Sequence, residues 1–480
     1  MKRTILLLAF MVSAALLASG VLASFGLTGS SARTKDRPNI LLIVTDDLDD
    51  RSDSIVNMGS LRSLVADRGV TLNNAYVTQA LCCPSRVSIL RGQYPHNTRV
   101  DENNGGDYQR FVSSGKEDDT FATWVQDAGY QTAYFGKYLN GYDTERMPAG
   151  WDRWFSDMGR SKLQNFNDDG DEVYLNPKKH HFEDVLRNEA LAWLRGRDDA
   201  PEPFLAVLSP HAPHSPATPA RRHANLFPGA DLPRPESFNE KQVDDKNGWI
   251  KQLEPLERGE IDEMETLYRN RLRVMEGVDE MLREVLSELR AQGELKNTYV
   301  FFTSDNGFHF GEKRFHQGKQ TSYEEDIAVP MIVSGPGVDA GAKGATRKHM
   351  VLNQDLAPTF AEIAGAETPR FVDGRSFLPV LGASPPPTSK WRDAFLVNSP
   401  ATSATGWLKG MPKNLAVRTP GYEYIDYARG KDELYDMTRD PHQVHSIHAD
   451  PPAGVLAKMK TKLADLRNCA AQTCTAAEGP

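Results

Sequence analysis

Cysteine is scarce in this chain, with four residues in 480. Cys82 and Cys83 are adjacent, whereas Cys469 and Cys474 are close to the C-terminus. Adjacent cysteines can barely reach the Cα separation of about 4.4–6.8 Å that a disulfide requires, so the first pair is either inert or chemically active. In an oxidising compartment the second pair would close a small disulfide loop.

An excess of basic residues is also lacking, because 56 Lys and Arg stand against 65 Asp and Glu, a formal net charge of −9. This balance argues against nucleic acid or an anionic membrane as the main partner, although it allows a local basic pocket for a small anion. The chain is 39% hydrophobic and 25% charged, which is typical of a soluble globular enzyme. Its length allows a main domain and a smaller one.

The first residues, "MKRTILLLAFMVSAALLASGVLASFG", combine a basic start with a long apolar run. This pattern predicts an export signal over residues 1–30, which we exclude from the fold. The apolar run approaches the ~20 residues that cross a bilayer, so an uncleaved N-terminal anchor is the alternative. Both interpretations predict an exported protein, either secreted or associated with the cell envelope, with no membrane contact unless the anchor is retained.

Short apolar runs recur along the chain and are typical of buried strands in a parallel sheet. They are Asn39–Val44, Thr132–Phe135, Phe204–Leu208, Thr298–Phe302 and Pro330–Val333. Amphipathic helices are expected between them, at 182–195, 261–291 and 355–365. This alternation predicts an α/β core with a large, mostly parallel sheet flanked by helices.

A Pro/Ser-rich stretch, residues 382–391, marks a domain boundary. We therefore expect a catalytic domain over 36–382 and a small α+β subdomain over 390–480. In the latter, "LAVRTPGYEYIDYA" alternates like an antiparallel hairpin with a Pro-Gly turn.

Polar residues follow four of the apolar runs, where each strand would end. Because ligands bind beyond the carboxyl ends of strands in open α/β sheets, we expect these side chains along one edge. They are Asp46, Asp47, Lys137, His214, Asp305 and Asn306. Carboxylate and amide oxygens suit Ca²⁺ or Mg²⁺ better than zinc. One Asp pair alone could be a turn, but two such pairs, each closing a buried strand, favour a metal.

The cysteine pair lies in "ALCCPSRVSILRG", residues 80–92. Pro84 suits the first turn of a helix, which would put Cys82 at or just before the helix N-terminus, where backbone N–H groups favour an anion. Arg86, one turn on, would reach that anion or the cysteine backbone. Cys82 is then either a thiolate nucleophile or a small buried residue.

The string Cys82-Cys83-Pro84-Ser85-Arg86 resembles the C-x-P-S-R motif of the type I sulfatase family. Other segments resemble that family in the same order, from Pro38 to Pro441: "PNILLIVTDD", "GKYLNGY", "PHAPHSP", "TSDNGFHFGE", "GKQTSYEEDIAVPMIVSGPG" and "ELYDMTRDP". "ALCCPSR", "GKYLN" and "DNGFHFG" resemble most the N-acetylglucosamine-6-sulfatase and heparan-6-sulfatase branch.

The resemblance implies an alkaline-phosphatase-like sandwich that hydrolyses sulfate esters of a sulfated sugar or a small aryl sulfate. It implies that a formylglycine-generating enzyme, a transient partner, converts Cys82 to Cα-formylglycine. One Ca²⁺ is implied, with Mg²⁺ as the alternative, bound by Asp46, Asp47, Asp305, Asn306 and the modified Cys82. Further implied site residues are Arg86 and Lys137, which would neutralise the sulfate, and His214 and Lys319, which would contact it and help to protonate the leaving oxygen.

One position departs from the family pattern, since Leu139 stands where many sulfatases carry a histidine that helps to deprotonate the aldehyde hydrate. His309 is our candidate for that role, with a packing role as the alternative; His211 is more in keeping with a structural role. Trp151 and Trp154 are either sugar-stacking or core residues.

Two alternative functions remain. One is a phosphodiesterase or phosphonate hydrolase of the same superfamily, and the other is a non-catalytic sugar-binding relative.

Overall fold

The computed structural model describes residues 37–50, 55–159, 164–197, 200–338, 340–402, 408 and 410–480. The predicted signal or anchor over residues 1–30 lies outside these ranges. Among the helices of the described residues, none has the length and apolarity that crossing a bilayer requires.

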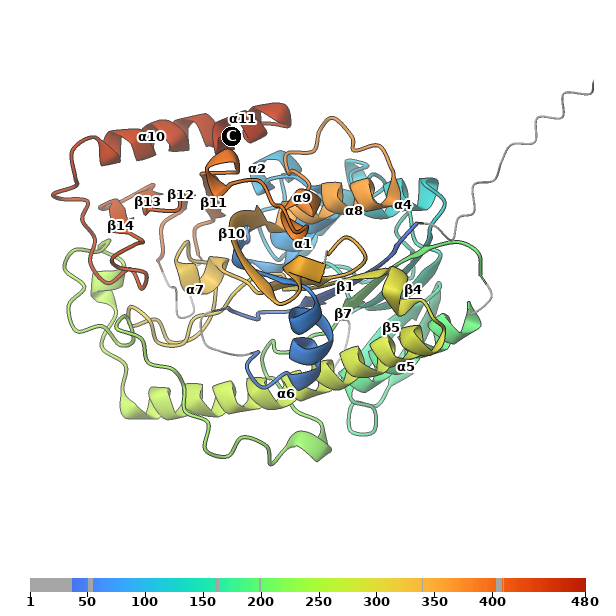
Figure 1. Cartoon of the computed structure of the whole chain (residues 1–480). Helices are drawn as coiled ribbons and strands as arrows, with labels where there is room; N and C mark the ends of the chain where they lie inside the picture. The colour runs from blue at the N-terminus through green and yellow to red at the C-terminus, as the bar shows by residue number, and fades with distance from the viewer. Residues whose placement is uncertain are drawn as a thin grey trace, which may run out of the picture.

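A ten-stranded sheet forms the centre of the molecule, in the order β10-β2-β9-β8-β1-β7-β3-β4-β5-β6 (Figure 1). The strands are β1 (Asn39–Thr45), β2 (Val70–Tyr76), β3 (Gln131–Lys137), β4 (Arg153–Asp157), β5 (Gln164–Asp168), β6 (Asp171–Leu175), β7 (Phe204–Ser209), β8 (Thr298–Ser304), β9 (Met331–Ser334) and β10 (Ala345–Leu352). The run β8-β1-β7-β3-β4 is parallel throughout, whereas β9, β5 and β6 pair antiparallel to their neighbours. All five predicted strands are present.

Helices cover both faces of this sheet, as Figure 1 shows. They are α1 (Cys82–Arg91), α2 (Pro95–Thr98), α3 (Gly105–Ser113), α4 (Phe121–Asp127), α5 (Phe182–Gly196), α6 (Arg258–Ala291), α7 (Glu324–Ile327), α8 (Leu356–Ala364), α9 (Leu378–Leu381), α10 (Val455–Leu466) and α11 (Gln472–Glu478). Every residue of β1 is buried. Ile40 and Leu42 face a core shared with α1, α4 and α8, whereas Leu41 and Ile43 face α5 and α6, which explains the unbroken apolar run in the sequence.

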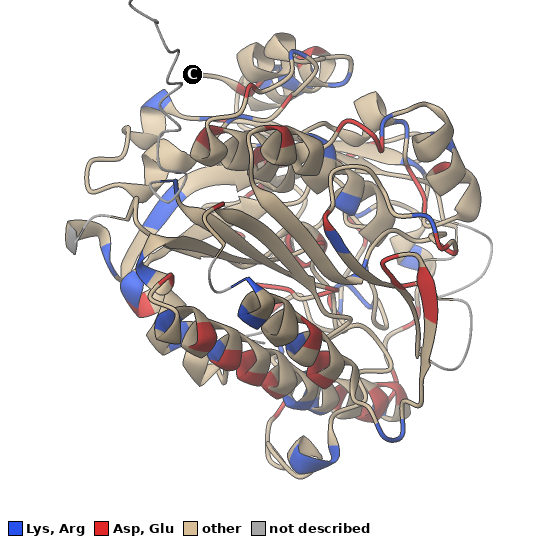
Figure 2. Ribbon diagram, turned by 90° about the vertical axis from the view of Figure 1, so that its right-hand side faces the viewer, with Lys and Arg blue, Asp and Glu red and all other residues tan. Residues whose placement is uncertain are grey.

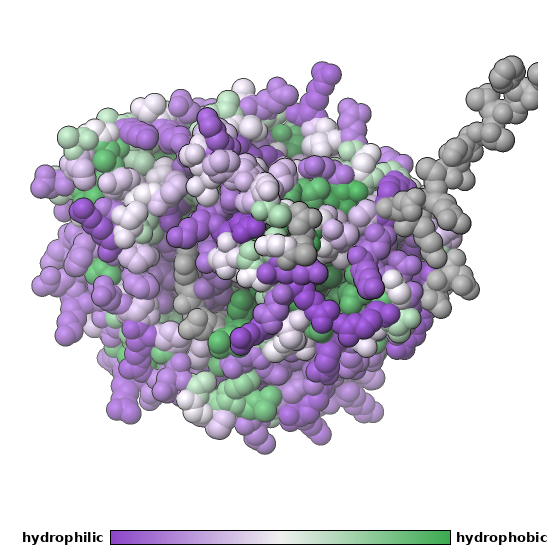
Figure 3. Space-filling model, in the orientation of Figure 1, coloured by the Kyte–Doolittle hydropathy of each residue, from purple (hydrophilic) through white to green (hydrophobic). Residues whose placement is uncertain are grey.

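The solvent side of the molecule carries mixed charge. Figure 2 shows residues of both signs interspersed along the helices below the sheet, and the face in Figure 3 is mostly hydrophilic with small apolar areas. The long α6 buries one stripe, as its three- and four-residue spacing predicts. Met275, Val278 and Leu282 of this stripe share a core with the sheet. Nearer the start of the helix, the stripe packs instead against Phe308 and Phe310 after β8.

The C-terminal part forms a four-stranded antiparallel sheet of β11 (Phe395–Ser399), β12 (Asn414–Arg418), β13 (Tyr422–Tyr427) and β14 (Glu433–Asp436). The predicted hairpin is β12–β13, and the predicted disulfide joins Cys469 to Cys474. Arg392, fully buried, pairs with Asp355 of the main body and Glu478 of α11. The α/β sandwich with a small α+β subdomain that the sequence predicted is therefore confirmed.

Candidate active site

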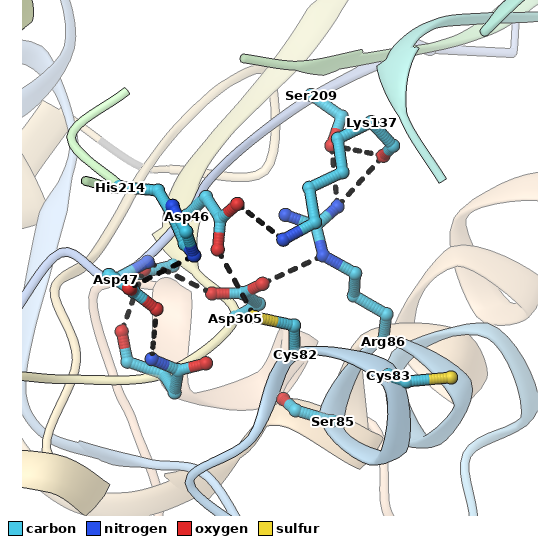
Figure 4. Close-up of polar contacts among 12 residues, drawn as sticks. Asp46, Asp47, Cys82, Cys83, Ser85, Arg86, Lys137, Ser209, His214 and Asp305 are labelled. Atoms are coloured by element: carbon cyan, nitrogen blue, oxygen red, sulfur yellow. Dashed lines mark hydrogen bonds and ion pairs between the residues drawn. The ribbon is translucent and has the colours of Figure 1, made fainter. Parts of the chain in front are cut away.

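The two adjacent cysteines at the start of α1 face two different environments. Successive side chains on an α-helix point about 100° apart, and Figure 4 shows the Cys83 sulfur pointing away from the cluster that Cys82 faces. Cys83 packs into the core, with its Sγ 3.8 Å from the Asn140 carbonyl oxygen. Cys82 Sγ lies 3.3 Å from Asp46 Oδ1 and 2.7 Å from Lys319 Nζ.

Cys82 is poorly suited to act as a thiolate. Its side chain is buried, and burial together with the Asp46 carboxylate raises the pKa of the thiol to about 12. A reactive thiolate requires the opposite shift. The unmodified thiol is therefore neutral at physiological pH, which argues against simple cysteine nucleophilic chemistry at this position.

Two neighbouring parallel strands bring the predicted oxygen ligands together. β1 and β8 pair in register up to Thr45 and Ser304, so the residues after them meet at the same edge. The Asp47 backbone N–H donates to Asp305 Oδ1 at 3.1 Å, and Asn306 Nδ2 donates to Asp47 Oδ1 at 2.7 Å. Asp47 has a left-handed backbone with φ of 68°, which an Asp tolerates better than most residues.

Three cations surround these carboxylates, as Figure 4 shows for two of them. Arg86 Nε donates to Asp305 Oδ2 at 2.7 Å, and its Nη1 donates to Ser209 Oγ at 2.6 Å. Lys137, at the end of β3, pairs with Asp46, and Lys319 pairs with Asp47. Five of these six charged side chains are buried, and that of Lys319 is 13% exposed.

The surroundings shift the pKa values of Asp46 and Asp305 in opposite directions. Burial alone would raise the pKa of Asp46, but Lys137, His214 and other cations outweigh it and hold that pKa well below its usual range. Burial and the Asp46 carboxylate raise the pKa of Asp305. Of the three carboxylates, Asp305 is therefore the one whose pKa is raised.

The donor set fits a hard divalent cation. One ligand atom each from Asp46, Asp47, Cys82 and His214 lies within 4.8 Å of the others. Asn306 Oδ1 is buried and has no hydrogen-bond partner among the described residues. An amide oxygen left without a donor, beside two carboxylates, is what a Ca²⁺ or Mg²⁺ ligand requires.

Two histidines follow β7 at the rim of this cluster. His214 Nε2 lies 3.7 Å from Asp47 Oδ2, with the side chain 40% exposed. His211 Nε2 lies 2.8 Å from Asp157 Oδ2, and its Nδ1 is 3.8 Å from Asp46 Oδ2. Burial disfavours the His211 imidazolium, but Asp157 and Asp46 raise its pKa to about 9. With Lys137, both histidines line a hollow of about 570 Å³.

His309 lies deeper than the other predicted site residues. It is buried, and its Nδ1 is 2.7 Å from Asp326 Oδ1. Its backbone exchanges hydrogen bonds with Gly318, the residue before Lys319. Within the described part of the chain, the hydrogen bonds of His309 do not include Cys82, and its Nε2 has no hydrogen-bond partner. The structure therefore links His309 to the segment that carries Lys319, and its catalytic role stays a prediction.

The two tryptophans are core residues. Trp154 is fully buried and Trp151 is 6% exposed. Both rings pack with Tyr134, at centroid distances of 4.9 and 5.2 Å. Neither ring is available to stack on a sugar, so the core interpretation is confirmed.

Sequence reasoning missed two residues that support the site. Ser209 Oγ accepts a hydrogen bond from Arg86 Nη1, and its hydroxyl donates to the Lys137 carbonyl oxygen at 2.7 Å. Arg271 of α6 is fully buried and donates to the Asp47 carbonyl oxygen. The signal in the sequence was an arginine beside the apolar stripe of the helix, three residues after Tyr268. Arginine is rarely buried without a partner, so this position indicates a contact with other polar groups.

Comparison with known proteins assigns the family. The family model "Sulfatase" matches residues 38–366, and the model "N-sulphoglucosamine sulphohydrolase, C-terminal" matches residues 311–469. The chain belongs to the sulfatase family. It is a sulfuric ester hydrolase, and the resemblance inferred from its motifs is confirmed.

Curated relatives agree with this assignment. An N-acetylglucosamine-6-sulfatase from Capra hircus is 33% identical over 94% of this chain and 86% of its own length. The extracellular sulfatase SULF-1 homolog from Drosophila melanogaster is 35% identical over 78% of this chain. The match spans 34% of that longer fly protein.

Solved structures share the fold. A protein in complex with its substrate D-glucosamine-2-N,6-O-disulfate superposes with a TM-score of 0.74 and 24% identity, covering 92% of this sulfatase and 98% of that chain. A phosphonate monoester hydrolase from Silicibacter pomeroyi superposes with a TM-score of 0.68 and 21% identity, covering 88% and 93%. At these identities the likeness shows the architecture alone.

Proposed function

We propose that this sulfatase removes the 6-O-sulfate from a glucosamine-type sugar, using Cys82 after its conversion to Cα-formylglycine. The carrying observation is the position of Cys82 Sγ at the start of α1, between Asp46 Oδ1 and Lys319 Nζ. The sugar and the sulfate position are proposed from the N-acetylglucosamine-6-sulfatase relative.

The modified residue would supply an oxygen nucleophile and, on the same carbon, a second hydroxyl for releasing sulfate, which a neutral thiol does not. Asp46, Asp47, Asp305 and Asn306 would hold one Ca²⁺, with Mg²⁺ as the alternative, whose positive charge would stabilise the sulfate oxygens.

The chain's own cations carry the rest of the proposed chemistry. Attack on a sulfate ester gathers negative charge around sulfur, and preorganised cations stabilise that charge without reorganisation. Lys137 and Lys319 lie at the carboxylates that face Cys82, and Arg86 is fixed by Asp305 and Ser209. These three residues would position the nucleophile and the sulfate.

A different residue must protonate the departing sugar oxygen. His214 is 40% exposed and lines the hollow that opens beside the cluster, so it can reach a bound sugar. His309 is our candidate for activating the aldehyde hydrate in place of the histidine absent at Leu139. Because His309 Nε2 is buried and has no hydrogen-bond partner among the residues that the structure describes, it is available to accept a proton.

The first test uses the cysteine pair as its own control. Mass spectrometry of the Cys82 peptide should find a form lighter than cysteine, because CH₂–SH is replaced by CHO. Cys82→Ala should abolish turnover of an aryl sulfate and of glucosamine 6-O-sulfate, whereas Cys83→Ala, whose sulfur faces the core, should keep it. A fully active Cys82→Ala protein would exclude the proposal.

A second test addresses the alternatives. The sulfatase should turn over sulfate esters faster than phosphate diesters or phosphonate monoesters of the same alcohol. The reverse order would favour a phosphonate hydrolase, and binding of sulfated sugars without turnover would favour a sugar-binding relative.

The same proposal includes export through residues 1–30 and modification by a formylglycine-generating enzyme. The Cys469–Cys474 disulfide and an extracellular relative support export.

A further inference from the structure

A second, basic hollow lies where the main body meets the C-terminal subdomain. Its volume is about 490 Å³. Four cations line it, from segments far apart in the sequence: Arg99 after α2, Arg110 of α3, Lys413 before β12 and Arg467 after α10. Among its described lining residues, Asp101 is the single carboxylate.

The four cations differ in their ion pairs within the part of the chain that the structure describes. Arg110 pairs with Asp107 at 2.7 Å. Arg99, Lys413 and Arg467 are exposed and form no ion pair with any other residue that the structure describes. Asp101 in the lining interacts with Lys413. On a chain with a net charge of −9, four cations around a hollow lined by this one carboxylate still create a local positive potential that attracts anions. The hollow is therefore suited to an anionic group.

A short loop connects this hollow to the nucleophile helix. Asp101 lines the hollow, and two residues later Asn103 Oδ1 accepts the Cys83 backbone N–H at 2.8 Å, at the start of α1. Two residues of extended chain span at most about 7 Å. One wall of the hollow is thus close to the residues that hold Cys82 in place.

The strand β11 makes a second connection. Asn398 lines the hollow, and the next residue, Ser399, donates through its hydroxyl to the carbonyl oxygen of Gln320. Gln320 follows Lys319, whose Nζ contacts Cys82. The same two segments therefore connect the hollow to the catalytic cluster.

We propose that the basic hollow, defined by Arg99, Arg110, Lys413 and Arg467, binds a second anionic group of the substrate. That group is a sulfate or carboxylate on another sugar of an acidic oligosaccharide whose sulfate ester is at Cys82. The inference rests on the proposed function and adds that the preferred substrate is an acidic oligosaccharide.

Another cationic hollow provides a matched control. It has a volume of about 590 Å³ and includes Lys296 and Lys343, both exposed. It lies beside Thr298, at the amino end of β8, whereas the catalytic cluster follows the carboxyl end. Removing charge there tests for unspecific attraction of acidic sugars to the protein.

The experiment compares three defined substrates at low salt, because screening lengths of about 10 Å at 0.1 M weaken exposed charge contacts. They are glucosamine 6-O-sulfate, a tetrasaccharide whose only acidic group is a terminal 6-O-sulfate, and the same tetrasaccharide with carboxylates and sulfates on its other sugars. The wild type should show a lower KM for the acidic tetrasaccharide than for the neutral one. The double variant Lys413→Ala, Arg467→Ala should raise that KM roughly three- to tenfold.

The same double variant should leave kcat and all constants for the monosaccharide unchanged, and Lys296→Ala, Lys343→Ala should leave every constant unchanged. Equal KM values for the two tetrasaccharides in the wild type, or equal effects of the two double variants, would overturn the inference. If the monosaccharide is not turned over at all, the proposed function fails. Calorimetric binding of the acidic tetrasaccharide to both double variants then decides on the hollow, with selective weakening in Lys413→Ala, Arg467→Ala supporting it and equal binding refuting it.

Discussion

Arg271 links three loops of the candidate active site. Its Nη2 donates to the Asp47 carbonyl oxygen after β1, and its Nη1 donates to the Pro213 carbonyl oxygen at 3.2 Å after β7. Its guanidinium lies 4.4 Å from the ring centroid of Phe308 after β8. The side chain is fully buried, so water cannot replace these contacts.

The variant Arg271→Met keeps most of the apolar stem and removes the charge. Two hydrogen bonds from a charged donor contribute about 1.5–3 kcal/mol each, and a desolvated cation–π contact contributes about 2 kcal/mol. Methionine regains part of this through packing, so we expect the free energy of unfolding to fall by about 4 kcal/mol. The Asp47 loop loses its anchor, and the affinity for Ca²⁺ should fall with it.

Urea unfolding and calorimetric Ca²⁺ titration measure the two effects. The matched control is Arg283→Met, on the same helix but with a side chain 52% exposed, which should change the free energy of unfolding by less than about 0.5 kcal/mol. An Arg271→Met protein within about 1 kcal/mol of the wild type, with unchanged Ca²⁺ binding, would refute the reasoning.

Three further predictions address the metal, pH and the disulfide. Asp305→Asn removes the carboxylate charge without changing its shape, so elemental analysis should find the bound metal lost along with activity; a fully active, metal-loaded variant would contradict the assignment. Burial raises the pKa of Glu312 from 4.5 to about 7, so the folded state binds more protons than the unfolded state between these values and loses stability, at most about 3 kcal/mol, as pH rises. Glu312→Gln should therefore raise the melting temperature relative to wild type at pH 8 but not at pH 4.5, and parallel pH curves would oppose this. Cys469→Ser with Cys474→Ser opens a loop with a sequence separation of 5 and should lower the free energy of unfolding by about 2 kcal/mol, with no change in turnover; a catalytic effect would contradict it.

The meeting of Asp46 and Asp47 with Asp305 and Asn306 could be predicted from the sequence. Each pair closes an uninterrupted apolar run, and such runs form the inner strands of parallel sheets. Parallel strands present their carboxyl ends at one edge, so two strand ends with oxygen donors meet there if their strands are neighbours. The pairing of β1 with β8 satisfies that condition.

Contacts between distant segments could not be predicted in the same way. Arg271 reaches Asp47 across 224 residues, and its role depends on how α6 crosses the sheet edge. The basic hollow brings Arg99 beside Lys413 and Arg467, whereas the sequence shows only an overall acidic balance. Net charge is a sum over the whole protein, whereas the binding of an anion depends on the charges that line one hollow.

The cysteine pair shows that a step of one residue along a helix changes the environment of a side chain. Cys82 and Cys83 both have a pKa raised to about 12, chiefly by burial, so neither thiol ionises at physiological pH. What distinguishes them is direction, since the Cys82 sulfur faces Asp46 and Lys319 whereas Cys83 faces the core. Lys137 and Lys319 lower the pKa of the Cys82 thiol, but burial and the Asp46 carboxylate outweigh them. Under the proposed function, conversion of Cys82 to Cα-formylglycine would supply the oxygen nucleophile that the neutral thiol does not.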